Sequence, residues 1–95
     1  MTVSLFVRHK VQDFDTWKGV YDGAAQLIKD NGVIADSVHR SLDDPNSIIV
    51  YHQFADTAAL EGFKTLMDSN EFKEGPEKAG GVLPGTMEMW VGEDA

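Results

Sequence analysis

The chain of 95 residues is long enough for one domain, but too short for a TIM barrel, a complete dinucleotide-binding domain or a protein kinase. Hydrophobic residues make up 42% of the chain and charged residues 25%, which is typical of globular proteins and excludes collagen-like or wholly disordered chains. Sixteen acidic residues against eight basic ones give a net charge of −8, so we expect neither nucleic acid nor a membrane as a partner.

The first third of the chain predicts a strand followed by a helix. Residues 3–11 alternate in polarity, and one face of this strand carries Val3, Leu5, Val7, His9 and Val11. Asp13 or Asp15 is expected to cap the helix. Its apolar face consists of Trp17, Val20, Tyr21, Ala24, Leu27 and Ile28. Gly32 fits a left-handed cap at the end of this helix.

The middle of the chain predicts a β-hairpin made of residues 33–42 and 47–54. The turn between them, Asp43-Asp44-Pro45-Asn46, consists of residues that favour turns. If Leu42 pairs with Ser47, then His39 faces Val50 and Ser37 faces His52. In this register His39 and His52 are diagonal neighbours on one face of the sheet.

The last part of the chain predicts a helix, a shorter helical segment, a loop and a final strand. Asp56 or Thr57 caps the helix, and its apolar face consists of Ala59, Leu60, Phe63, Leu66 and Met67. A second helical segment starts at Ser69 or Asn70 and ends at about Ala79. A glycine-rich loop over residues 80–85 leads to a strand over residues 86–91. One face of that strand carries Met87, Met89 and Val91, and the other carries Glu88 and Trp90.

The resulting order βαββαβ predicts one domain over residues 1–95 with a ferredoxin-like α+β sandwich fold. Right-handed crossovers give a four-stranded antiparallel sheet of order 4-1-3-2 with both helices on one face. The other face is also apolar and includes Phe6, Ile34, Val38, Ile49, Tyr51 and Trp90. Because so large a patch is unfavourable on a monomer, we predict a homodimer with the two sheets face to face. The only arginines, Arg8 and Arg40, are expected on this dimer face, paired with Asp36 or Glu88.

The chain contains no cysteine, which excludes disulfides, thiolate metal sites and cysteine nucleophiles. Its first residues lack the long apolar region of a signal peptide, and no apolar run approaches the ~20 residues needed to cross a bilayer. We therefore expect a cytoplasmic protein.

Three stretches, distributed along most of the chain from residue 7 to residue 82, resemble a known family: residues 7–18, residues 43–50, and residues 58–63 with 79–82. The chain resembles the dimeric α+β barrel superfamily, and more narrowly its antibiotic biosynthesis monooxygenases and stress-responsive barrel proteins. The resemblance implies a pocket in each subunit between the sheet and its helices. Relatives use this pocket to oxidise aromatic polyketides without metal or flavin, to cyclise polyketides with a His and Tyr pair, to degrade haem or to handle chlorite.

The expected topology places several aromatic and histidine side chains in this pocket. We predict His9, His39 and Tyr21 as catalytic residues. A neutral histidine would take a proton from a phenol or an activated carbon, and Tyr21 would donate a hydrogen bond to the developing oxyanion. The predicted substrate-binding residues are Trp17, His52, Phe63 and Met67. Among them, Trp17 would stack on a planar aromatic ring.

These residues predict a small-molecule enzyme, a monooxygenase or cyclase that needs no metal or other cofactor and acts on an aromatic or polyketide-like compound. One alternative uses the three histidines as ligands of a zinc or iron ion, although the chain lacks His-x-His and His-x-x-x-His spacings, or any one of them as the axial ligand of haem. The other alternative is a non-catalytic dimer that binds a small ligand or responds to stress. A pocket filled by Trp17, Tyr21 and Phe63 would favour that non-catalytic protein.

Overall fold

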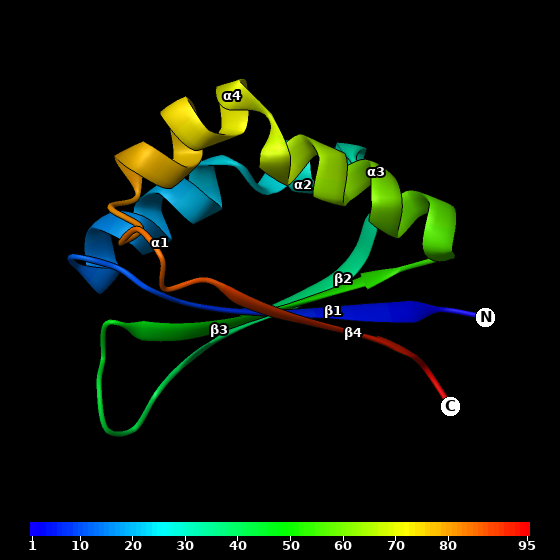
Figure 1. Cartoon of the computed structure of the whole chain (residues 1–95), viewed down its shortest axis with the longest axis horizontal. Helices are drawn as coiled ribbons and strands as arrows, with labels where there is room; N and C mark the ends of the chain where they lie inside the picture. The colour runs from blue at the N-terminus through cyan, green and yellow to red at the C-terminus, as the bar shows by residue number, and fades with distance from the viewer.

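The computed structural model describes all 95 residues and places the helices against one face of a four-stranded antiparallel sheet (Figure 1). The strands are β1 (Val3–Lys10), β2 (Val33–Arg40), β3 (Ser47–Phe54) and β4 (Glu88–Glu93). The helices are α1 (Phe14–Gly23), α2 (Ala25–Asp30), α3 (Thr57–Asp68) and α4 (Asn70–Phe72), which continues into the π-helical turn η1 (Lys73–Glu77). The sheet order β2-β3-β1-β4 confirms the predicted ferredoxin-like α+β sandwich. None of the helices combines the length and the apolar character that crossing a membrane requires.

The predicted helix starts are confirmed because a carboxylate caps each one. The side chain of Asp13 accepts a hydrogen bond from the Thr16 N–H at 3.0 Å, and that of Asp56 accepts one from the Ala59 N–H at 2.9 Å. Each bond satisfies a backbone donor that has no partner inside the first helical turn. The first predicted helix is divided at Ala24 into α1 and α2.

The core lies between the sheet and the helices. Its buried apolar residues are Val3, Leu5, Val7, Val11, Trp17, Ile28, Val33, Ile48, Val50, Phe54, Leu60 and Phe63. Two histidines, His9 on β1 and His52 on β3, are buried at the same level and are each only 5% exposed. In each of them the Nδ1 atom has no hydrogen-bond partner. Buried polar atoms rarely lack a partner, so these two histidines mark a candidate functional region of the core.

The hairpin between β2 and β3 has a register one residue away from the predicted one. The Ser41 N–H, rather than that of Leu42, is bonded to the Ser47 carbonyl, at 2.9 Å. Leu42 is displaced from the strand and is fully exposed in the loop. Because successive residues of a strand point to opposite faces, a shift of one residue exchanges the two faces of β2.

The longer loop is held by contacts with a distant part of the chain. The carbonyl of Asn46 accepts a hydrogen bond from the Val11 N–H at 2.9 Å, and its side-chain Oδ1 accepts one from the Phe14 N–H at 3.0 Å. Asn46 thereby ties the end of the loop to the junction between β1 and α1. Within the loop, the Asn46 N–H also donates to Asp44 Oδ1 at 3.0 Å, so local and distant contacts together hold a loop one residue longer than predicted.

Three expectations on β2 are wrong because of this register. Asp36, not Ser37, lies opposite His52, and His39 lies opposite Ile49. His39 is therefore on the face away from the helices, and its predicted diagonal contact with His52 is not formed.

Two further residues of β2 lie on the helix side of the sheet rather than on the predicted dimer face. Val38 packs against the core, and the guanidinium of Arg40 lies 4.1 Å from the centre of the Phe14 ring. The contact of Arg40 with an aromatic face replaces the predicted pairing with a carboxylate across a dimer interface.

The chain returns to the sheet edge through α4, η1 and a glycine-rich loop. In η1 the Lys78 N–H bonds to the Lys73 carbonyl, five residues back, and Pro76 lies inside this turn. Gly80 then passes so close to Trp17 that a Cβ at this position would lie 3.0 Å from the indole ring. Close backbone approach therefore requires glycine here. The last strand starts at Glu88, two residues later than predicted.

Candidate active site

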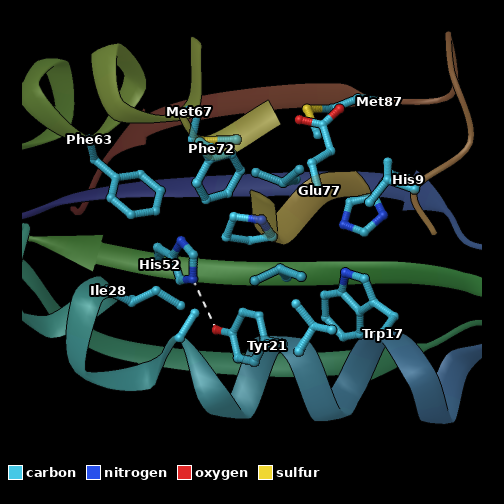
Figure 2. Close-up of a pocket in the computed structure, with 16 residues that line it drawn as sticks. His9, Trp17, Tyr21, Ile28, His52, Phe63, Met67, Phe72, Glu77 and Met87 are labelled. Carbon is cyan, nitrogen blue, oxygen red and sulfur yellow. Dashed lines mark hydrogen bonds between the residues drawn. The ribbon is translucent and has the colours of Figure 1, made fainter. Parts of the chain in front are cut away.

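A cavity lies between the sheet and the helices, and His9 and His52 lie at opposite ends of it (Figure 2). The residues that line it are Val7, His9, Trp17, Val20, Tyr21, Ala24, Ile28, Val50, His52, Phe63, Met67, Phe72, Pro76, Glu77, Val82 and Met87. About 80 Å³ is open to water-sized molecules, more than the ~10–15 Å³ that one water needs. A planar ligand would therefore have to displace flexible side chains such as Met67 and Met87.

Aromatic rings form a continuous row along the cavity. Trp17 and Tyr21 are one turn apart on α1 and stack with their centres 5.0 Å apart. The Tyr21 ring is nearly parallel to that of His52, at 6.2 Å, and the His52 ring meets Phe63 edge-on at 5.1 Å. At the other end, His9 lies edge-on to Trp17 at 5.5 Å. This lining suits a flat, largely apolar molecule.

A hydrogen-bonded chain leads from His52 through Tyr21 to Asp36. The Tyr21 oxygen lies 2.8 Å from Asp36 Oδ2 and 3.0 Å from His52 Nε2. A carboxylate can only accept, so the single hydroxyl proton of Tyr21 is donated to Asp36. The Nε2 atom of His52 must then carry the ring proton and donate it to Tyr21, which assigns the His52 tautomer from the network. Nδ1 of His52 is left as a bare acceptor.

The environment keeps His52 neutral. Its Nδ1 is buried and has no hydrogen-bond partner. Burial lowers the pKa of His52 to about 4, although the charge of Asp36 acts in the opposite direction. Burial, followed by the hydrogen bond to Asp36, raises the pKa of Tyr21 well above its usual range. At neutral pH the cavity is therefore lined by a neutral imidazole, whose buried Nδ1 has no partner, beside a tyrosine that keeps its proton.

His9 provides a second neutral imidazole at the far end of the cavity. Its Nδ1 is also buried without a partner, and burial lowers its pKa to about 4. Leu5 lies opposite His52, and His9 is four residues further along β1, about 13 Å at the usual rise of a strand. The two histidines thus line the cavity at separate points.

Of the seven residues predicted for the site, six line this cavity: His9, Trp17, Tyr21, His52, Phe63 and Met67. His39 does not, because it lies on the opposite face, where its Nε2 is 2.9 Å from Ser37 Oγ. The set of three histidines considered for a metal ion is consequently not formed, and nowhere do three His, Asp or Glu side chains converge as a metal site needs. The chemical roles assigned to the cavity residues stay predictions.

Two carboxylates near the site were missed by the sequence analysis. Asp36 was placed on the dimer face because the hairpin register was wrong by one residue. Glu77 reaches the cavity from η1 (Figure 2), and a π-helical turn changes which side chains face the sheet. Pro76 inside the second helical segment was the available signal that the regular helical spacing would not hold there.

Comparison with known proteins is consistent with this fold. SnoaB, a cofactor-independent oxygenase from Streptomyces nogalater, is 18% identical over 99% of this chain and 93% of its own, with a TM-score of 0.74. A putative antibiotic biosynthesis monooxygenase from Bordetella bronchiseptica is 12% identical over 99% and 97%, with a TM-score of 0.79. The ActVA-Orf6 monooxygenase of Streptomyces coelicolor, solved in complex with nanaomycin D, is 19% identical over 98% and 87%, with a TM-score of 0.69.

A search of curated protein sequences found no match. In contrast, the sequence profile of one family, described as antibiotic biosynthesis monooxygenase, matches residues 5–75, which is most of the chain. The chain therefore belongs to the antibiotic biosynthesis monooxygenase family.

Proposed function

We propose that the protein is a cofactor-independent monooxygenase that oxidises a flat aromatic compound in the cavity between the sheet and the helices. The observation that carries this proposal is the buried, unpartnered Nδ1 of His52, a neutral base on a residue that lines an apolar cavity with aromatic rings. Family membership and the likeness to a cofactor-independent oxygenase support the same class of reaction.

The proposed reaction starts with loss of a proton from the substrate. With the substrate ring against Trp17, Nδ1 of His52 takes a proton from a phenol or from a CH₂ group activated by neighbouring rings. The resulting anion is electron-rich and reacts with O₂. The apolar cavity provides few polar groups that would stabilise the anion and so make it less reactive. Conversion of such a CH₂ group to C=O, with O₂ as oxidant and water as second product, is balanced. The substrate supplies all the electrons, and no external reductant is required.

The proposal is tested by oxygen uptake with metal-free, EDTA-treated protein and a panel of hydroxylated anthrones and naphthols. We expect uptake of one O₂ per product, and with ¹⁸O₂ one labelled oxygen in the product. A second candidate, ligand binding without turnover, is favoured by the small free volume of the cavity. Binding of the same compounds without any oxygen uptake would favour this second candidate and contradict the monooxygenase.

We also propose that two copies of the chain pair through the face of the sheet away from the helices. This face is uncovered (Figure 1), and Phe6, Ile49 and Trp90 are 41, 40 and 51% exposed on it. Homodimer interfaces are more apolar than the rest of the protein surface, and aromatic side chains are enriched in them. Light scattering should give a dimeric mass for the wild type and a monomeric mass for Trp90→Glu. The control Leu42→Glu adds the same charge at an exposed leucine in the hairpin loop, and a monomeric wild type would contradict the pairing.

A further inference from the structure

One chain of hydrogen bonds runs from the buried cavity to the protein surface. Asp36 and His52 lie directly opposite each other on neighbouring strands, and Tyr21 reaches both from α1. His52 is buried, Tyr21 is partly buried and Asp36 is exposed to solvent. The bond between Tyr21 and His52 is drawn in Figure 2. The chain of hydrogen bonds thus connects a buried imidazole to an exposed carboxylate.

We propose that Asp36, Tyr21 and His52 form a proton relay between a substrate in the cavity and the solvent. The inference rests on the proposed function, in which His52 removes a proton from the substrate. Asp36 is then a positioning and relay residue that never touches the substrate. The steps below follow from the donor and acceptor assignments of the three side chains.

The outward step moves one proton at each link. The substrate proton binds Nδ1 of His52, the Nε2 proton passes to the Tyr21 oxygen, and the Tyr21 proton passes to the Asp36 carboxylate, which releases it to water. His52 is left neutral with its proton on Nδ1. The inward step reverses these transfers: Nδ1–H gives one proton to the oxygen that leaves as water, the remaining C–H of the substrate carbon supplies the second, and Nε2 regains a proton through Tyr21. The protein thereby returns to its starting tautomer.

The other titratable groups of the cavity do not offer this route. His9 is about 13 Å further along the sheet by strand spacing, and it is itself buried without a partner at Nδ1. Glu77 lies on the side of the cavity opposite Tyr21 (Figure 2) and has no hydrogen bond to His52. The relay through Tyr21 is the one hydrogen-bonded connection from His52 to an exposed carboxylate.

The relay can be tested without any substrate. In ¹⁵N-labelled protein, NMR measures how fast the Nε2 proton of His52 exchanges with water. We expect exchange to be slower by about 100-fold in Tyr21→Phe, which keeps the ring but removes the link. If Tyr21 only supported the structure, Tyr21→Phe would loosen the site, and the Nε2 proton would exchange faster than in the wild type. Exchange in Tyr21→Phe that is as fast as in the wild type, or faster, would overturn the relay.

A second arm tests Asp36 during turnover of an anthrone. In Asp36→Ala, kcat should fall with KM unchanged, and added acetate should restore it because the position is exposed. Acetate should not rescue Tyr21→Phe, whose internal link is missing. Asp43→Ala, which removes an exposed carboxylate in the hairpin loop, is the matched control. An unchanged kcat in Asp36→Ala, or no rescue by acetate, would overturn the role of Asp36.

The two arms separate this inference from the proposed function. If the wild-type protein oxidises none of the compounds but Tyr21→Phe slows proton exchange, the relay is supported and the monooxygenase is contradicted. If the protein oxidises them but exchange is unaffected by Tyr21→Phe, the monooxygenase stands and the relay is overturned.

Discussion

Replacing His52 with glutamine should lower the kcat for oxidation of an aromatic substrate by about 10²–10⁴-fold, the usual contribution of a positioned base. Glutamine has a similar size and can donate to the Tyr21 oxygen, so the row of side chains along the cavity should persist. It offers no basic lone pair at the position of Nδ1. The stacking surface of Trp17 is untouched, so KM should change little. Steady-state oxygen uptake at neutral pH measures both constants.

The matched control for this experiment is His39→Gln. His39 lies on the opposite face of the sheet and does not line the cavity, so its replacement should leave kcat at the wild-type level. Circular dichroism establishes that both variants are folded. Loss of activity in His39→Gln with retention in His52→Gln would place the chemistry on the other face and contradict the site described above.

The free energy of unfolding should fall steeply as the pH is lowered from about 6.5 to about 4. His9 and His52 each have a pKa of about 4 when folded, against 6.5 for an ordinary histidine. In this window the unfolded chain binds more protons than the folded one, so stability decreases as pH decreases. Each shift corresponds to roughly 3 kcal/mol. The two together approach the total stability of a small domain, about 5–15 kcal/mol.

Urea unfolding at a series of pH values between about 7 and about 4 measures this effect. His9→Gln and His52→Gln each remove one buried titrating group, so each should have a shallower pH dependence than the wild type. Asp94, whose pKa is lowered by hydrogen bonds from Ser4, Thr2 and Gln53, acts in a different window. Its contribution is lost only at pH values below the ordinary carboxyl range. An unchanged slope in both histidine variants would contradict the buried neutral histidines.

Much of the fold follows from local signals in the sequence. The alternation of Val3, Leu5 and Val7 predicts a strand with one buried face, and the structure buries all three. Asp13 and Asp56 precede helices and cap them. These signals are reliable because each depends on neighbours a few residues away. The family resemblance and the strand order depend on the same pattern, and both are confirmed.

The lining residues of the cavity could be predicted from the sequence where they lie on helices or strands with a regular hydrophobic spacing. Trp17 and Tyr21 are four residues apart on α1, and Phe63 and Met67 are four apart on α3, so each pair faces the sheet together. His9 continues the alternation of β1 into the cavity. Glu77 was not predictable in this way, because the π-helical turn around Pro76 interrupts the helical period.

The residue of β2 that lies opposite His52 depended instead on the length of the hairpin loop. Asn46 binds the N–H groups of Val11 and Phe14, which are more than thirty positions away in the chain. The hairpin loop is one residue longer than turn propensities predict, so Asp36, rather than Ser37, lies opposite His52. Side chains alternate across a sheet with a period of two, so a single residue in a loop determines which of two neighbours enters the site. Turn propensities alone do not specify that choice, because the loop is held by local bonds, such as that from the Asn46 N–H to Asp44 Oδ1, and also by contacts of Asn46 that form only when distant segments pack together.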